Sequence, residues 1–368
     1  MNPQNKVRMR DLAIRDEVLL EEYIDVFREV LTSGSLILGP KNEELEELIQ
    51  KITGARYASV CSSASSGLYL AMKALNIGPG DEVITTPMSW LVSSSAILQV
   101  GAVPVFVDVD ENYNLNPAEV VRAISPSTKA MLVVHYYGRL AQIQDLQKLA
   151  QEHNLYLIED CAQAFGVQKD KVFAGTFGDV GVFSFSPMKV VGGFGDAGAI
   201  VTKHKHIYER INVLRHCGTV DRELCVSPES KHIMDSLHAA LLIKILPTYE
   251  DLIHHRRKLG WRYIEGLNDV VDCPNLGNGT EHSSYDFPIK LKDRDALHSF
   301  LNGLGIESRV RHPLLISDQP VHKNSKKFPL VRAKQFVNEI LCLPMHNNMQ
   351  AHEVDIVIGA VRQFKLDR

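Results

Sequence analysis

The sequence predicts an α/β protein with a large, mostly parallel sheet that carries helices on both faces, followed by a smaller α+β domain. Between residues 57 and 160, short β-branched runs alternate with helical periods of about ten to fourteen residues. Near Pro247 this rhythm changes to a long helix followed by separate strands and helices. We therefore expect a large domain at residues 1–247 and a smaller one at residues 248–368, since 368 residues suit two cores better than one.

Two helices are expected before the alternation begins. Apolar residues recur at helical spacing in residues 19–33 and 44–53, and the two runs stop at Gly34 and Gly54. Strands are then expected at the runs YASVC, DEVITT, VPVFVDV, KAMLVVHYY, LYLIED and GVFSF. After Pro247 we expect a helix over residues 249–267, strands at YDFPIKL and ESRV, and a final helix at EVDIVIGAVRQF.

Composition excludes several classes of protein. Apolar residues make up 45% and charged residues 23%, values typical of globular proteins, and the net charge of −4 gives no general attraction to nucleic acid. No apolar run approaches the ~20 residues of a membrane span, and the first residues do not resemble a signal peptide. The six cysteines form no C-x-x-C pair, which favours reduced thiols in the cytoplasm and no metal site.

One lysine follows a strand in an unusual setting. Lys189 comes after the run GVFSF and a turn at Pro187, and a glycine-rich stretch follows it. A lone lysine beside a flexible loop is usually a solvated residue, but glycines also permit the close backbone approach that a planar cofactor needs. The same stretch contains G-x-G-x-x-G at residues 193–198, yet it leads into the strand-like run AIVT, so a dinucleotide site is not expected.

Three further motifs lie where strands end. Asp160 ends the strand run LYLIED, at the sheet edge where open α/β sheets bind ligands, although an aspartate there also suits a helix N-cap. Ser63, Ala64 and Ser65 join a strand to a helix, which favours phosphate binding by the helix N-terminus or ordinary serine capping. Trp90, just past another strand, would either stack on a ligand or fill the core.

Taken together, these motifs resemble the DegT/DnrJ/StrS family of sugar aminotransferases, which depend on pyridoxal 5′-phosphate (PLP). The resemblance runs almost end to end, and the ordered set of motifs is specific although no single member is. It rests on the motifs SLILGP, GPGDEV, PVFVD, EDCAQA, FSFSPMK, CLPMH and EVD. The family implies the fold-type-I PLP aminotransferase architecture, with a homodimer and active sites at the subunit interface.

The resemblance assigns roles to individual residues. Lys189 would hold PLP covalently, and Asp160 would keep its pyridine nitrogen protonated so that the ring accepts electrons. Trp90 and Ala162 match the pair that sandwiches the ring, with Gln163 near the ring oxygen. The phosphate would be held by Ser63, Ala64, Ser65, Ser184 and, from the partner subunit, Lys231.

The chain departs from the family's pattern at three places. The usual Ser-Gly-Thr loop is Ser63-Ala64-Ser65, and the segment around Lys231 is atypical. The usual His-Tyr-Pro stretch reads Arg311-His312-Pro313, with Arg309 two residues earlier. Arg309, Arg311 and His312 would either form a solvated edge or bind an anionic acceptor or the donor's carboxylate, since arginine suits bidentate carboxylate recognition.

The resemblance implies transfer of the amino group of L-glutamate to a keto or aldehyde sugar, in a cytoplasmic pathway of amino-sugar and polysaccharide biosynthesis. A nucleotide-linked 3- or 4-keto-hexose is the expected acceptor. The alternative is a free acidic sugar, such as an 8-oxo-3,8-dideoxy-octulosonate used for lipopolysaccharide. A PLP-dependent sugar dehydratase would carry histidine in place of Lys189, and a non-catalytic regulatory relative would have lost parts of the cofactor set.

Overall fold

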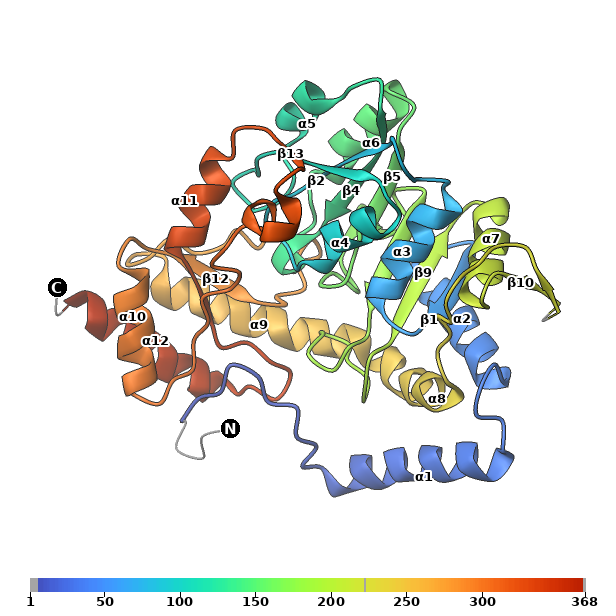
Figure 1. Cartoon of the computed structure of the whole chain (residues 1–368). Coiled ribbons are helices and arrows are strands. Elements are labelled where there is room, and N and C mark those ends of the chain that lie inside the picture. The colour runs from blue at the N-terminus through green and yellow to red at the C-terminus, as the bar shows by residue number, and fades with distance from the viewer. Residues whose placement is uncertain (1–5, 222, 367–368) are drawn as a thin grey trace.

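The computed structural model describes residues 6–221 and 223–366. Residues 1–5 and 222 of the predicted large domain and residues 367–368 of the predicted small domain therefore lie outside it. Its main element is an eight-stranded sheet (Figure 1). All neighbouring strands in this sheet pair in parallel except at β9, which is antiparallel to both of its neighbours. In spatial order the strands are β1 (Tyr57–Cys61), β9 (Gly198–Thr202), β8 (Val180–Ser184), β5 (Tyr156–Asp160), β4 (Thr128–Val134), β2 (Glu82–Thr85), β3 (Val103–Phe106) and β13 (Lys326–Lys327). The predicted mostly parallel sheet is confirmed.

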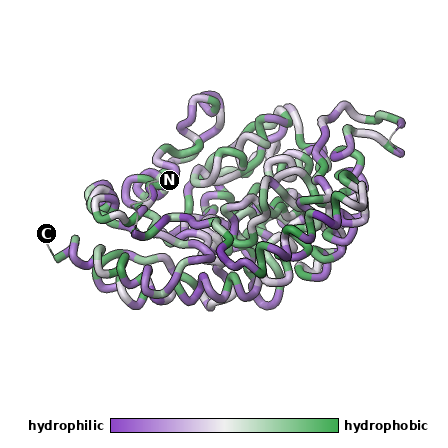
Figure 2. The backbone as a smooth tube through the Cα atoms, turned by 90° about the horizontal axis from the view of Figure 1, so that it is seen from below, coloured by the Kyte–Doolittle hydropathy of each residue, from purple (hydrophilic) through white to green (hydrophobic). Residues whose placement is uncertain are grey.

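Helices cover both faces of the sheet, as predicted. The helices are α1 (Glu17–Ser33), α2 (Pro40–Thr53), α3 (Ala64–Ala74), α4 (Val92–Gln99), α5 (Pro117–Ala123), α6 (Ile143–Glu152), α7 (Lys205–Arg215), α8 (Ser236–Ile245), α9 (Tyr249–Leu267), α10 (Arg294–Gly303), α11 (Val331–Glu339) and α12 (Ala351–Leu366). Seen from below, apolar and polar stretches alternate along the coiled segments (Figure 2), as expected for helices that bury one face. Gly34 and Gly54 end the first two helices in the left-handed conformation, where predicted.

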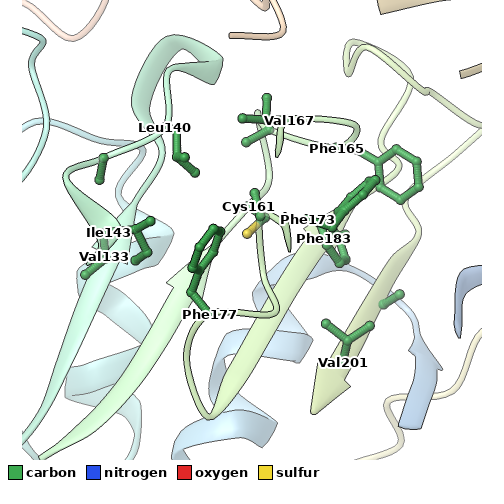
Figure 3. Packing of buried hydrophobic residues seen from close by; sticks show 14 of the residues in the cluster. Val133, Leu140, Ile143, Cys161, Phe165, Val167, Phe173, Phe177, Phe183 and Val201 are labelled. Atoms are coloured by element: carbon green, nitrogen blue, oxygen red, sulfur yellow. The ribbon is translucent and has the colours of Figure 1, made fainter. Parts of the chain in front are cut away.

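Strand β4 shows why the sheet is apolar on both sides. Its Ala130 and Leu132 pack in the cluster that contains α3, α4 and α7. Its Met131 and Val133 pack in the opposite cluster, with α2, α5, α6 and α8. A strand covered on both faces reads as a continuous apolar run, since successive side chains point to opposite sides. Figure 3 shows residues of the second cluster, which include Val133, Cys161, Phe165, Phe173, Phe183 and Val201.

The C-terminal part has a separate core beside the long helix α9 (Figure 1). The antiparallel pair β12 (Phe287–Lys290) and β14 (Ile340–Leu343) packs there with α10 and α12. Two features cross the predicted boundary at 247/248, which remains a prediction. Val7 packs in this C-terminal core and bridges Ile306, and β13 joins the edge of the large sheet.

Several predicted strands are shorter in the structure. The run KAMLVVHYY keeps its strand only to Val134, and Tyr136–Gly138 form a 3₁₀ turn. The run ESRV forms only an isolated bridge, between Arg309 and Cys342, so the prediction of a strand there is wrong. The remaining short strands are β6 (Gln168–Lys169), β7 (Val172–Phe173), β10 (Thr219–Val220) and β11 (Leu224–Cys225). Among the described residues, no helix is long and apolar enough to cross a bilayer.

Candidate active site

A cavity of about 330 Å³ lies where the parallel strands β5 and β8 end. Its wall includes every residue proposed from the sequence except Lys231. Those residues are Ser63, Ala64, Ser65, Trp90, Asp160, Ala162, Gln163, Ser184, Lys189, Arg309, Arg311 and His312. The carboxyl ends of parallel strands meet at one edge of the sheet, which brings together residues more than a hundred positions apart.

Asp160 places a buried carboxylate on the cavity wall. It is the last residue of β5, and only 5% of it is exposed. One carboxylate oxygen accepts a hydrogen bond from Ser93 Oγ at 2.8 Å, and the other accepts from the Ala162 backbone N–H at 3.1 Å. No helix follows Asp160, so the N-cap alternative is wrong. These bonds orient a negative charge towards any cationic group in the cavity.

The loop before α3 forms a second part of the wall. Ser63 is the N-cap of α3, and its hydroxyl accepts from the Ser66 backbone N–H at 3.1 Å. Serine capping is therefore present, and the first turn of the helix still directs its backbone N–H groups to the cavity edge. Gly198 lies so close that a Cβ there would come within 2.6 Å of the backbone of Ser63 and Ala64, so only glycine fits.

Lys189 reaches the cavity from a tight loop. Its backbone N–H donates to the Ser186 carbonyl at 2.9 Å, and a Cβ on Gly192 would come within 2.5 Å of the Pro187 carbonyl oxygen. The glycines at 193–198 lead into the strand β9, as predicted, so they do not form a dinucleotide fingerprint. The half-buried side chain of Lys189 places its Nζ 4.9 Å from the centre of the Tyr285 ring.

Trp90 and Gln163 lie on the same wall. Trp90 is 55% exposed, so the core-filling alternative is wrong, and its ring centre lies 5.6 Å from that of His312. Gln163 Oε1 accepts a hydrogen bond from the Tyr137 backbone N–H at 2.7 Å. That bond depends on Tyr137, whose φ of 56° turns the chain directly after β4. The exposed indole leaves a flat apolar surface open to a planar ligand.

The two arginines of the small domain have different environments. Arg311 is largely buried, with an ion pair of 3.0 Å to Asp286 and a hydrogen bond of 3.0 Å from Nη2 to the Tyr285 hydroxyl. The side chain of Arg309 is exposed and has no polar partner among the residues that the structure describes. The solvated-edge alternative is therefore wrong for Arg311, whereas Arg309, exposed on the cavity wall, is compatible with both alternatives. Burial and the charge of Arg311 lower the pKa of His312 to about 4, so the imidazole is neutral at pH 7.

Lys231 lies apart from these residues, exposed and outside the cavity wall. Its backbone bridges His216. The neighbouring Glu229 is fixed against α3, since it accepts a hydrogen bond from the Tyr69 hydroxyl at 2.7 Å and pairs with Lys73 at 2.9 Å. The atypical Glu229 thus anchors the segment that carries Lys231.

Sequence reasoning missed other residues of the wall, namely Leu68, Ser89, Val92, Ser93, Ser186, Met188, Asp196 and Tyr285. Ser89 and Ser93 could have been found from the sequence, because two serines four positions apart bracket Trp90. In the structure their hydroxyls lie 2.9 Å apart. Tyr285 carried none, since it precedes a strand and resembles an ordinary core tyrosine. Its place becomes evident only when Lys189 and Arg311 converge on it.

Beneath the cavity, His135, Glu159 and Cys161 bring potential metal ligands together. The polar atoms of His135 and Glu159 already have partners within the protein. Glu159 accepts from the backbone N–H groups of Gly175 and Gly178 and lies 3.0 Å from His135 Nε2. We interpret this cluster as a brace that fixes the ends of β4 and β5 beneath Asp160.

The sequence model of the DegT/DnrJ/EryC1/StrS aminotransferase family matches residues 18–362 of this chain. The chain belongs to that family. A relative from Acidithiobacillus ferrooxidans, named UDP-N-acetyl-3-dehydro-alpha-D-glucosamine 3-aminotransferase, is 32% identical over 99% of this chain and 99% of its own. A relative from Geobacillus stearothermophilus, named pleiotropic regulatory protein, is 32% identical over 97% of this chain and 98% of its own.

A solved family structure connects the fold to a cofactor. The NtdA protein of Bacillus subtilis, solved with bound cofactor PMP, superposes with a TM-score of 0.88 at 29% identity and covers 96% of this chain and 82% of its own. The family's aminotransferases use PLP, and this chain has the fold-type-I architecture. The cavity fits PLP, since its wall presents the amine of Lys189, the buried carboxylate of Asp160 and the N-terminus of α3, whose loop packs tightly on Gly198.

Proposed function

We propose that this PLP aminotransferase moves the amino group of L-glutamate to the carbonyl of a nucleotide-linked 3- or 4-keto-hexose, in cytoplasmic amino-sugar biosynthesis. The observation that carries the proposal is the convergence of Lys189 and Asp160 on one cavity. The relative from Acidithiobacillus, named for a UDP-linked 3-keto sugar, supports the class of acceptor. The six cysteines, all within the described residues, are free thiols, which suits a reducing compartment.

In this proposal, PLP supplies the electron sink, and the chain's own residues orient it and move protons. The amine of Lys189 would hold the cofactor and, once freed by the amino donor, would carry the proton taken from the substrate Cα. Asp160 keeps the pyridine nitrogen protonated, and Ser93 holds its carboxylate in place. Trp90, Ala162 and Gln163, all on the cavity wall, would hold the cofactor ring, Gln163 from the side of its oxygen. Ser63, Ala64, Ser65 and Ser184 hold the phosphate.

We propose a homodimer in which the partner subunit's Lys231 completes the phosphate site. Support comes from Lys231 itself, which is exposed and absent from the cavity wall of its own chain. Helix α1 lies along one edge of the molecule (Figure 1) and exposes Val18, Leu20, Phe27 and Leu31. Exposed apolar side chains on one helix are typical of a surface that another subunit covers.

A free acidic sugar, such as an 8-oxo-3,8-dideoxy-octulosonate, is the second candidate acceptor. The observation that favours it is Arg309, whose guanidinium stands at the cavity with no described partner. Arg311 contributes less than its sequence suggests, because its guanidinium is already paired with Asp286 and bonded to the Tyr285 hydroxyl. A single arginine without a described partner, such as Arg309, also suits the phosphates of a nucleotide sugar. The keto-hexose therefore remains the preferred acceptor.

Borohydride reduction of the holoenzyme followed by peptide mapping tests the central assignment. The label is expected on Lys189, and a label on another lysine would overturn the proposal.

A second experiment identifies the acceptor. The PMP form of the enzyme is mixed with keto and aldehyde sugars, both nucleotide-linked and free, and return of the PLP spectrum identifies the acceptor. A binding or regulatory protein would show no turnover with any amino donor, whereas a dehydratase would release a deoxygenated sugar without consuming glutamate.

A further inference from the structure

The ring of Tyr285 lies where three separate segments of the chain meet. Tyr285 is 2% exposed, and it contributes to the cavity wall. The Lys189 Nζ is 4.9 Å from its ring centre, and the guanidinium carbons of Arg10 and Arg311 are each 5.1 Å from it. A ring within about 6 Å of a cation attracts it through the negative face of its π-system. The lysine proposed to bind PLP therefore lies within cation–π range of this ring.

Tyr285 is held in place at both of its ends. Its hydroxyl accepts a hydrogen bond from Arg311 Nη2 at 3.0 Å. Its backbone carbonyl accepts from Arg256 Nη2 at 2.7 Å and from Arg10 Nη2 at 3.1 Å. The ring therefore cannot swing away without breaking its bond to Arg311, and the bonds from Arg256 and Arg10 fix the backbone that carries it.

Asp286 holds this frame together. Its carboxylate is fully buried and pairs with Arg311 at 3.0 Å and with Arg10. A buried carboxylate between two guanidinium groups is strongly constrained, because without it both positive charges would lack this counter-ion in a low-dielectric interior. Arg10, from the N-terminal segment, thereby becomes part of the support for the active site.

We propose that Tyr285 is a positioning residue for Lys189, with its ring set by Arg10, Arg311 and Asp286. This inference rests on the proposed function, in which Lys189 is the cofactor-binding amine. The ring face holds the lysine's amine at one place on the cavity wall, where it is displaced by an amino donor and returns afterwards. The inference also explains why Arg311 is not available as an anion receptor.

The charges around Tyr285 agree with this geometry. Burial raises the pKa of its hydroxyl, but the positive charges of Lys189 and Arg311 outweigh the effect and leave that pKa below its ordinary value. Lys189 and Tyr285 are therefore coupled electrically as well as by contact. An ordinary buried tyrosine gives the contrast. Burial raises the pKa of Tyr263, whose hydroxyl donates to the Pro344 carbonyl and whose ring stacks on Phe287.

Competitive labelling of lysines in the apoprotein tests the inference without relying on activity. A trace amine-acylating reagent is applied, and mass spectrometry gives the rate at Lys189 relative to that at Lys290. Lys290 is a suitable internal standard, because its amine lies 5.0 Å from the Phe336 ring and 2.6 Å from Asp272, away from the cavity. The variants are Tyr285→Leu and Tyr285→Phe, with Tyr263→Leu as the matched loss of a buried tyrosine.

In Tyr285→Leu, the ratio is expected to rise roughly three- to tenfold, because the cation–π contact that holds the amine against the ring is lost. Tyr285→Phe keeps the ring and should stay within about twofold of the wild type. Tyr263→Leu should leave the ratio unchanged. If Tyr285→Leu fails to fold, Tyr285→Met with Tyr263→Met as its control replaces this comparison.

Two results would overturn the inference. One is an unchanged ratio in the folded leucine or methionine variant of Tyr285. The other is an equal rise in the Tyr263 control, which would show general loosening. Failure of the proposed function is distinguishable, since it would appear as borohydride labelling of a different lysine in the wild-type holoenzyme.

Discussion

The two walls of the cavity differ in how their residues are held. On the cofactor wall, Ser63 and Lys189 are fixed by backbone groups three residues away, and Asp160 is held by the backbone N–H of Ala162 together with the hydroxyl of Ser93. On the opposite wall, the hydroxyl of Tyr285 is fixed by Arg311, and Asp286 pairs with Arg10, which is 276 positions away. The first wall follows mainly from local chain geometry, with Ser93 as its one named long-range support, whereas the second exists only in the folded molecule. We therefore expect the cofactor wall to carry the shared chemistry and the other wall to distinguish this chain from its relatives.

The sharpest test of the cofactor wall is Asp160→Asn. The variant should still bind PLP, but its half-reaction with glutamate should slow by roughly ten- to hundredfold, because a charge-assisted hydrogen bond contributes about 1.5–3 kcal/mol. Rapid mixing with glutamate, followed by the change in cofactor absorbance, measures this rate. Ser93→Ala is the matched control, since it removes one bond to the carboxylate and leaves the charge. Near-normal turnover of Asp160→Asn would refute its role.

The opposite wall predicts different effects for its two arginines. Arg311→Gln should lower the free energy of unfolding by about 3 kcal/mol, because it leaves the buried Asp286 with one ionic partner fewer. Arg309→Gln should leave stability unchanged and weaken acceptor binding by about one to two decades, the effect of losing a charge-assisted bond. Denaturant unfolding and the two separate half-reactions measure these effects. If only the glutamate half-reaction suffers in Arg309→Gln, that arginine belongs to the donor site.

The stability effect of Arg311→Gln should also depend on pH. Burial raises the pKa of Asp286, but Arg311 and Arg10 outweigh it and hold that pKa below 3.8. A carboxylate with a depressed folded pKa stabilises the protein above its unfolded pKa and loses this contribution as pH falls through its folded pKa. The difference between wild type and Arg311→Gln should therefore be full at neutral pH and shrink below about pH 4. A difference that does not change with pH would mean that Arg311 acts through packing alone.

The last prediction, with the smallest expected effect, concerns whether a second subunit completes the cofactor wall. A subunit-exchange experiment tests it. Lys189→Ala and Lys231→Ala proteins are mixed under conditions of subunit exchange. If Lys231 serves the partner's site, heterodimers carry one site with both lesions and one with neither, and activity should return to about a quarter of the wild-type value at statistical mixing. If Lys231 acts within its own chain, every site keeps a lesion and no activity returns.

Much of the fold follows from periodicity in the sequence. Runs such as YASVC and LYLIED match β1 and β5 closely, because apolar strands buried on both faces leave a strong continuous signal. The two-residue strand β13 left no such signal, yet it closes one edge of the large sheet. No strand forms at the run ESRV, because only Arg309 pairs with another segment there, through its single bridge to Cys342. Pairing of short segments depends on what lies beside them, which a local pattern does not record.

The same division applies to the site. The sequence alone determined that Lys189, Asp160 and Ser63 meet at one edge of the sheet, because parallel strands place their carboxyl ends together. Only the tertiary structure decided that Arg311 is buried in an ion pair with Asp286, while Arg309 has no polar side-chain partner among the described residues. Two arginines two residues apart look equivalent in a sequence. Their charges act differently because the energy of a charge depends on its burial and its partners, and long-range packing sets both.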